Sequence, residues 1–305
     1  MDFAGLASAY AAMGNFAVVP DTSTANYKIN SDGSQAARLR VNRFPFKFYF
    51  HQDGPGLPTF VQLNWVNQSF KSGFELTPDD TVVSYWKTRG ATFTGGVEYP
   101  LTEVITLVPA MDVGVLKINK NADYLSPAGI SYLQPIFANA VFDWDTKAWV
   151  LGGSLGLDYR TDFGSRPVAA HSSLAHNHIQ SFSEATRFVE FSEGTTTLAI
   201  AAEMTFPTPY KFMGLPVAVI SHLENTSFWG GNRDVLGFDH FYEAGLSVEL
   251  DVRDLGMTVR AWQLGFKAII SDDVDSWVLD LGYRFRLLAV CRFSRVGINR
   301  SEWCF

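Results

Sequence analysis

The sequence predicts an all-β protein, a closed antiparallel transmembrane β-barrel of twelve strands. Apolar and polar residues alternate along most of the chain with the period of two that strands show. The alternating segments run about 10–14 residues, which exceeds the roughly 5–6 residues of soluble strands and suffices for a tilted strand to cross a bilayer. Aromatic residues stand at the ends of the apolar stripes, as in the interfacial girdles of membrane barrels.

The composition supports a membrane protein that does not use helices to span. The charged fraction is 18%, below the roughly 25% of soluble domains, and no stretch reaches the roughly 18 uninterrupted apolar residues of a transmembrane helix. The net charge of −7 argues against a nucleic-acid partner, because phosphate contact needs a positive surface. Both cysteines, Cys291 and Cys304, lie near the C-terminus, and a chain otherwise free of cysteine fits an oxidising compartment.

We divide the chain into three parts. Residues 1–15 form an N-terminal segment without the basic region of a signal peptide, and we expect a short surface or lumen helix from the spacing of Phe3, Leu6, Tyr10 and Met13. Residues 16–285 form the barrel. Residues 286–305 form an atypical C-terminal tail, because the aromatic Phe285 resembles the terminal residue of bacterial barrels and an arginine-rich stretch without alternation follows it.

The twelve strands are assigned where alternation is bounded by turn residues. In "RFPFKFYFH", four phenylalanines lie on one side of the predicted strand. An apolar face opposite a face of glycine and charged residues is predicted for four further segments: "AWVLGGSLGLDYR", "TLAIAAEMTF", "YEAGLSVELDV" and "WVLDLGYRF". We predict strands at 17–30, 37–50, 59–70, 88–99, 105–118, 132–143, 148–160, 196–206, 214–228, 242–252, 256–270 and 277–285.

The connections predict the orientation of the barrel. Tight turns are expected at 99–103, 143–149, 207–214 and 252–257, and longer polar stretches lie at 71–87, 119–131, 161–175 and 229–241. Outer-membrane barrels have short periplasmic turns and long extracellular loops, so both chain ends are placed on the periplasmic side. Segment 176–194 leaves a rival count of fourteen strands open. We favour an extracellular extension there, because "RFVEF" is too short for a lipid-facing stripe.

Alternation assigns one face of each strand to lipid and the other to the lumen. The expected aromatic girdle on the lipid face comprises Trp149, Tyr159, Tyr242, Trp277, Tyr283 and Phe285. The expected lumen-lining residues are Asp112, Asp158, Arg160, Glu203, Glu243, Glu249, Asp251, Lys267, Asp280 and Arg284. As a pore lining, these mostly acidic residues would select cations. We instead favour a network of ion pairs, because buried charges are tolerated when each has a partner of opposite charge. Twelve strands fall between filled eight-stranded and open sixteen-stranded barrels, so conductance stays undecided.

The segment "HSSLAHNH" holds the weak candidates for chemistry. His171 and Ser173 have the spacing of a base and nucleophile in outer-membrane lipid esterases, and Asn177 could orient the histidine. His171, His176 and His178 could also hold a transition metal, although no cysteine or clustered carboxylate completes such a site. A polar extracellular loop explains the same residues, so we predict a non-enzymatic protein without metal or cofactor.

Several sequence segments resemble those of the family of solitary outer-membrane autotransporter-like barrels. They are "GGVEYPLTEVITLVPAMDVGVLKI", "VVPDTSTANYKI", "RFPFKFYF" and "EMTFPTPYKFMGLPVAVI", and the resemblance covers about residues 16–285. It implies a twelve-stranded barrel in the outer membrane of a Gram-negative bacterium, with no established activity and no catalytic residues. Since about fifteen residues precede the first strand, we expect no secretion of a passenger in cis.

The expected role is a membrane-embedded scaffold or narrow translocation pore. The alternatives are a porin-like diffusion channel for small solutes and a rim esterase that acts on lipid. The expected partners are outer-membrane lipid and the barrel-assembly machinery, and the long loops leave an unidentified extracellular ligand open.

Overall fold

The structure is a computed structural model that describes residues 24–29, 35–50, 56–77, 80–138, 141–184, 190–230, 239–253, 259–271 and 274–285. The expected N-terminal helix at 1–15 and the tail at 286–305 lie outside these residues. None of the helices in the described ranges has the length and hydropathy needed to cross a membrane.

The described chain is an antiparallel sheet of long strands, which confirms the all-β prediction. Its strands are β1 (Thr24–Ile29), β2 (Gln35–Phe50), β3 (Thr59–Thr77), β4 (Asp80–Val97), β5 (Tyr99–Pro100), β6 (Ile105–Tyr124), β7 (Trp144–Phe163), β8 (Arg166–Glu184), β9 (Ser192–Phe212), β10 (Leu215–Gly230), β11 (His240–Asp251), β12 (Val259–Ile270) and β13 (Val274–Phe285). Many of them exceed the roughly 9–11 residues that a bilayer requires.

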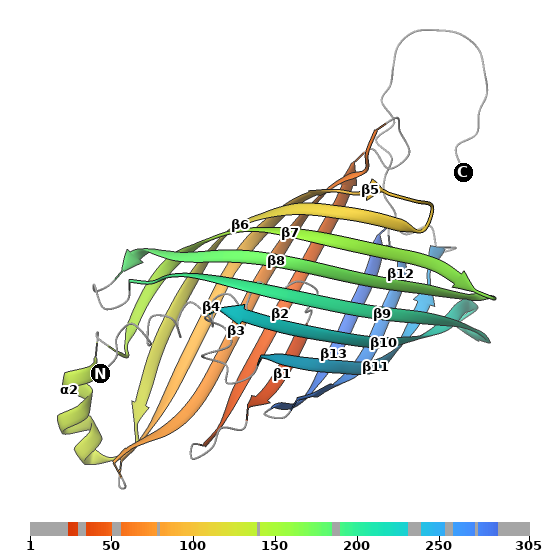
Figure 1. Cartoon of the computed structure of the whole chain (residues 1–305). Coiled ribbons are helices and arrows are strands. Elements are labelled where there is room, and N and C mark those ends of the chain that lie inside the picture. The colour runs from red at the N-terminus through yellow and green to blue at the C-terminus, as the bar shows by residue number, and fades with distance from the viewer. Residues whose placement is uncertain are drawn as a thin grey trace.

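Strands that are neighbours in sequence are neighbours in the sheet, and β4 pairs directly with β6 beside the two-residue β5. The first and last strands also pair, with Ala25 opposite Val278 and Ile29 opposite Val274. Figure 1 shows the consequence for shape, because the sheet curls until β2, β3 and β4 lie behind β7, β8 and β9.

The connections lie at two ends of the sheet, which we call the turn end and the loop end. The turn end holds the connections at 98–104, 164–165 and 213–214, and the loop end holds those at 125–143 and 185–191. Three expected connections are wrong. Residues 144–149 begin β7, most of 71–87 belongs to β3 and β4, and 161–175 contains a two-residue turn. Alternation in these segments is weaker, because polar residues occupy both faces toward the strand ends.

The predicted strand at 132–143 is also wrong. A π-helical turn, η1 (Gly129–Leu133), leads into the short helix α2 (Gln134–Phe137), which lies at the loop end in Figure 1. Leu133 and Phe137 are four residues apart and so share one helical side. They pack on the buried cluster of Val82, Tyr124, Val141 and Phe142. The expected extracellular extension at 176–194 is wrong for 176–184, which belongs to β8.

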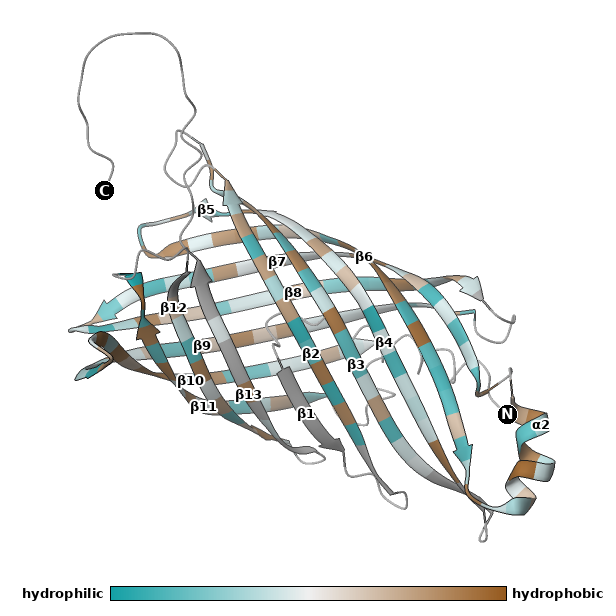
Figure 2. Ribbon diagram, turned by 180° about the vertical axis from the view of Figure 1, so that it is seen from behind, coloured by the Kyte–Doolittle hydropathy of each residue, from teal (hydrophilic) through white to brown (hydrophobic). Residues whose placement is uncertain are grey.

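Burial alternates along the strands and defines an outer and an inner face. Large apolar side chains are exposed on the outer face, and Figure 2 shows apolar and polar bands alternating along the ribbons. The inner face is closely packed in the half next to the loop end, where apolar side chains are buried beside polar ones. Its fully buried apolar residues include Leu39, Val41, Val66, Leu116, Ile118, Val150, Phe228, Phe241 and Ile269. Buried polar and charged residues occur along both halves of the inner face, with Gln68, Thr88 and Glu243 nearer the loop end and Ser247 nearer the turn end.

The turn between β9 and β10 offers a test of local strain. Met213 and Gly214 form its two central residues with φ of 52° and 85°, which is the pattern of a type I′ turn. Methionine tolerates a positive φ poorly, whereas asparagine is favoured there. Met213→Asn is therefore expected to raise the free energy of unfolding by about 0.5–1 kcal/mol, measured by denaturant titration in detergent micelles.

Met111 provides the matched control, because it lies within extended β6 on the exposed outer face. Met111→Asn relieves no positive φ and is expected to leave the stability unchanged or lower it. Equal changes in stability from the two substitutions would contradict the assignment of strain to Met213.

Candidate functional site

Polar side chains from four adjacent strands meet on the inner face between β9 and β12. The pairing of β9 with β10 places Glu203 opposite His222, and that of β10 with β11 places Ile220 opposite Ser247. Glu249 lies opposite Gln263 in the next pair. Since side chains two residues apart share a face, these registers bring Glu203, His222, Ser247 and Gln263 together. We call these four residues the His222 network.

The His222 network is joined by short contacts. His222 Nδ1 lies 3.0 Å from Glu203 Oε1, and His222 Nε2 lies 2.6 Å from Ser247 Oγ. Gln263 Nε2 donates to Ser247 Oγ at 2.7 Å. Ser247 and His222 are 2% and 8% exposed, whereas Glu203 is about half exposed. The network therefore runs from a buried hydroxyl to a carboxylate that reaches an open space.

A second group, the Lys267 cluster, comprises Lys267, Glu224 and Glu243. Lys267 Nζ lies 3.5 Å from Glu224 Oε2 and 3.4 Å from Glu243 Oε2, and all three side chains are largely buried. The two glutamates face each other across β10 and β11. A buried carboxylate pair of this kind needs a cation between its members, because like charges at short range repel strongly away from water.

Charged side chains also meet on the inner face at the turn end. Asp158 accepts a hydrogen bond from His171 Nδ1, and Arg160 lies 3.5 Å from Asp158. A hollow of about 600 Å³ opens beside them. Its lining is formed by Arg160, Thr161, Asp162, Pro167, Val168, Ala169, Glu203 and Thr205. Glu203 therefore belongs both to this polar hollow and to the His222 network.

The structure brings several of the residues expected to line the lumen into pairs. Beyond those above, Asp112 accepts a hydrogen bond from Thr94, and Asp251 pairs with Arg253. Glu249 is on the inner face between Ser247 and Asp251. The positions of Asp280 and Arg284 lie in β13, but their side chains are outside the described part of the chain.

Four of the six expected girdle residues stand on the outer face. Trp149, Tyr159, Tyr242 and Trp277 are between 40% and 50% exposed. Trp149 stacks on Phe182 of the neighbouring strand with ring centroids 4.8 Å apart, and Trp277 stacks on Phe266 at 6.2 Å. The side chains of Tyr283 and Phe285 lie outside the described part of the chain.

The weak candidates in "HSSLAHNH" do not form the arrangement that the spacing suggested. Ser173 is buried in the middle of β8, opposite Gly156 and Ala199, and so does not lie at a rim. His171 shares its face and contacts Asp158, and Asn177 is buried farther along the same face. We therefore do not propose a rim esterase.

The histidines expected to share a metal point to different faces. His176 and His178 are exposed on the outer face, where they contact Thr196 and Ser192 at 2.9 and 3.1 Å, whereas His171 belongs to the inner face. Over the ranges that the structure describes, no three His, Cys, Asp or Glu side chains are placed to hold a metal ion.

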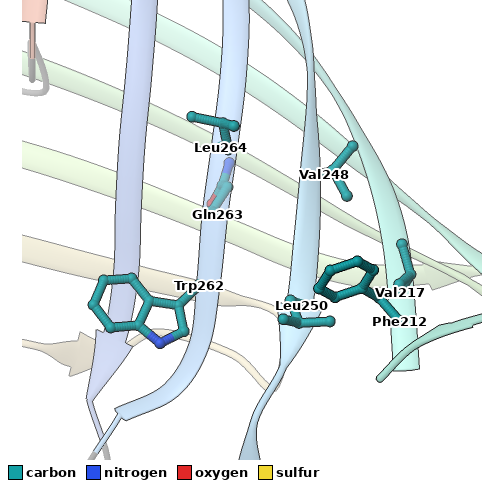
Figure 3. A pocket seen from close by; sticks show the side chains of 7 residues that line it. All are labelled: Phe212, Val217, Val248, Leu250, Trp262, Gln263 and Leu264. Atoms are coloured by element: carbon teal, nitrogen blue, oxygen red, sulfur yellow. The ribbon is translucent and has the colours of Figure 1, made fainter. Parts of the chain in front are cut away.

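An apolar hollow of about 390 Å³ lies on strands β9 to β12 near the turn end. Figure 3 shows its lining residues, Phe212, Val217, Val248, Leu250, Trp262, Gln263 and Leu264. Val248, Trp262 and Leu264 are exposed outer-face residues. A hollow with such walls suits a hydrocarbon chain better than water.

Sequence reasoning treated Glu203 as a general lumen residue and did not single out His222, Ser247 or Gln263. The hairpin centred on Met213 and Gly214 would pair His222 with Thr205 if its register ran unbroken from the turn. A bulge between Pro216 and Ala218 shifts that register. Counting from the turn alone would therefore have misplaced the pair.

Comparison with known proteins relates this chain to the β-barrel domains of outer-membrane autotransporters. The sequence family described as "Solitary outer membrane autotransporter beta-barrel domain" matches residues 13–270. No curated protein matches the chain in sequence. The structure is similar to the β domain of the Bordetella autotransporter BrkA, with a TM-score of 0.53, 10% identity, and coverage of 87% of this chain and 97% of that one.

Two further solved structures are similar to the same extent. The translocator domain of the autotransporter NalP from Neisseria meningitidis gives a TM-score of 0.54 at 10% identity, with coverage of 87% of this chain and 86% of that chain. The transport unit of AIDA-I from Escherichia coli gives 0.53 at 9% identity, with coverage of 86% and 88%. At such identities the likeness shows a shared autotransporter-barrel fold.

Proposed function

Because the chain belongs to the solitary outer-membrane autotransporter β-barrel family, we propose that it is a closed transmembrane barrel of twelve strands, serving as a bacterial outer-membrane scaffold with an occluded lumen. The pairing of β1 with β13 and of β4 with β6 supports closure, since each long strand then has a partner on both sides. Lipid offers no hydrogen bonds to a free strand edge, so a spanning sheet must close.

The observation that carries this proposal is the exposed apolar outer face. Phe44, Phe46, Phe48 and Phe50 project from one side of β2, and equivalent rows of exposed leucine, valine and tryptophan follow on the other strands. A soluble monomer rarely exposes contiguous apolar patches beyond a few hundred Å². Such a surface suits the hydrocarbon of a membrane, and the apolar hollow on β9 to β12 would accept acyl chains.

The packed inner face supports a scaffold more than an open pore. In the loop-end half, the rings of Phe228 and Phe241 pack in a tilted arrangement with centroids 5.8 Å apart and are nearly inaccessible to water. On the same strands and the neighbouring β12, next to these rings, the Lys267 cluster pairs charges that a pore would present to solutes. A diffusion channel is the second candidate, and the polar hollow of about 600 Å³ beside Arg160 is the feature that favours it.

Gel migration and planar-bilayer conductance test the proposal together. We expect the folded protein to migrate differently before and after heating, because barrels resist denaturation by detergent at room temperature. We expect no current steps from the native chain, since the lumen is occluded. Steps of a defined size would contradict the scaffold and support the channel, and migration unaffected by heating would contradict the barrel itself.

A pair of variants makes the conductance experiment specific to the inner face. Phe228→Ala with Phe241→Ala removes two packed inner-face rings, and we expect this double variant to admit small currents. Trp229→Ala with Tyr242→Ala changes the adjacent outer-face residues of the same strands and is expected to remain silent. Currents from both double variants would indicate general loosening of the wall.

The proposed partners are outer-membrane lipid and the barrel-assembly machinery. The outer face would contact lipid along its whole apolar band, and the aromatic residues would lie at its boundaries. The unpaired edges of a growing sheet would need the assembly machinery until β13 reaches β1.

A further inference from the structure

We propose that Ser247, His222 and Glu203 form a serine-hydrolase triad on the inner face, which cleaves carboxylic esters of small hydrophilic molecules. This activity goes beyond the scaffold role. It uses residues from three strands, and none of them belongs to the "HSSLAHNH" segment.

The contacts have the order that nucleophilic catalysis requires. Ser247 Oγ lies 2.6 Å from His222 Nε2, and His222 Nδ1 lies 3.0 Å from Glu203 Oε1. In such a triad the serine attacks, the histidine accepts its proton, and the carboxylate orients the imidazole. Triads are recognised by this geometry, whatever the order of the residues in the chain.

The surrounding hydrogen bonds fix the protonation pattern that a base needs. An ionised carboxylate can only accept, so Glu203 places the proton of neutral His222 on Nδ1 and leaves the Nε2 lone pair facing Ser247. Gln263 Nε2 donates to Ser247 Oγ at 2.7 Å and lies 3.2 Å from His222 Nε2, and the shorter contact of 2.6 Å between Ser247 Oγ and His222 Nε2 is the one along which the hydroxyl proton of Ser247 points. The network thus presents an activated serine in its resting arrangement.

The residue across the sheet from the nucleophile is a glycine, which has no side chain to contact it. Gly265 lies opposite Ser247 in the sheet, and a Cβ atom at that position would lie 2.8 Å from Ser247 Cβ. That distance is too short for an ordinary carbon contact. A side chain at position 265 would therefore crowd the serine, and glycine avoids that clash.

The neighbouring hollow indicates the class of substrate. Glu203, the outermost triad member, also lines the hollow of about 600 Å³ together with Arg160, Asp162 and Thr205. Charged and hydroxyl-bearing walls favour a hydrophilic group beyond the scissile bond. The volume fits a small molecule, so an acyl group such as acetate on a polar alcohol is the expected substrate.

The reaction proceeds in two balanced steps. Ser247 Oγ bonds to the ester carbonyl carbon while its proton passes to His222, and Gln263 Nε2 shifts its donation from Oγ to the developing oxyanion. The ester C–O bond breaks, and His222 returns the proton to the departing alcohol. Water then attacks the acyl-serine with His222 as base, which releases the carboxylic acid and regenerates Ser247.

Covalent labelling of the folded full-length protein in detergent micelles tests the nucleophile. With diisopropyl fluorophosphate, the Ser247 O–P bond forms, the P–F bond breaks, and fluoride and the hydroxyl proton leave. We expect mass spectrometry to find the label on Ser247. His222→Gln should slow labelling at least about a hundredfold, the scale of general-base catalysis. Ser173→Ala replaces another buried inner-face serine and should leave labelling unchanged.

The outcome is decisive because folding is monitored separately by heat-dependent gel migration. A folded protein without label on Ser247 would overturn the triad while leaving the scaffold proposal intact. Label that persists at the native rate in His222→Gln would overturn it as well. Migration unaffected by heating would contradict the barrel instead.

Glu203 is a positioning residue, and its role needs a readout that packing alone would not move. Glu203→Gln keeps the shape of the side chain but removes its charge, so a purely structural role predicts unchanged labelling. We expect labelling to slow at least tenfold, and we expect Glu203→Asp to recover part of the rate. Turnover of p-nitrophenyl acetate should exceed that of p-nitrophenyl palmitate, and the reverse preference would contradict the hydrophilic substrate class.

Discussion

Replacing Lys267 by methionine is expected to lower the free energy of unfolding by about 3–5 kcal/mol, the loss that follows when a buried ion pair is broken on one side. Glu224 and Glu243 face each other across β10 and β11, and Lys267 lies within 3.5 Å of both carboxylates. Without the ammonium group, two poorly hydrated negative charges would oppose each other. Denaturant titration in detergent micelles, followed by tryptophan fluorescence, measures the loss.

The exposed pair of Lys117 and Asp145 supplies the matched control. Its atoms are 3.4 Å apart, similar to the Lys267 contacts, but its side chains are 54% and 58% exposed. Lys117→Met is therefore expected to change the stability by about 0–1 kcal/mol, as for surface pairs generally. Adding Glu243→Gln to Lys267→Met should recover part of the loss. Equal effects of the two lysine substitutions would show that burial does not govern these charges.

Leu246→Arg is expected to reduce the stability of the bilayer-inserted protein by about 2–4 kcal/mol, the measured scale for arginine on the lipid face near the membrane midplane. Leu246 is 60% exposed at the centre of β11, with apolar Val248 beyond it on the same face. The new guanidinium group would have hydrocarbon beside it. Unfolding in lipid vesicles at graded denaturant concentrations measures the change.

Asn121→Arg tests the same new side chain outside the apolar band. Asn121 is exposed on the outer face of β6 near the loop end, where polar Asn119 and Asp123 flank it. Its replacement should alter stability by less than about 0.5 kcal/mol, as for ordinary surface positions. The facing assignment fails if the arginine at position 246 is tolerated as well as the one at position 121.

Alternation predicted strands where one face carries large apolar side chains, as in β2, β7 and β11. It failed where the outer face is polar. The outer face of β8 presents His176, His178 and Gln180 after Leu174, so the segment lacks an apolar stripe although its backbone is paired on both sides. The opposite error occurred at 132–143, where an apolar run resembled a strand. The i, i+4 spacing of Leu133 and Phe137 indicated the helical turn that forms.

The sequence predicts that the inner face is polar, but it does not predict which polar side chains contact each other. Period two predicts which side of its strand each of Glu203, Glu243 and Lys267 occupies, because facing depends on parity alone. Which of them meet depends on register, and register is set by turns and bulges. The shift between Pro216 and Ala218 alters the count across β9 and β10, and Gln263 joins the network from a fourth strand. Neither feature has a marker in the local sequence.

The pairing of β1 with β13 also constrains how the protein can be made. Since β1 comes first and β13 last among the described strands, the seam between them cannot form until β13 has been synthesised. A chain interrupted before Val274 would expose the backbone groups of β1 and β12, and either edge could recruit a second chain. The pairing of β13 with β1 is thus the event that removes the edges through which the sheet could aggregate.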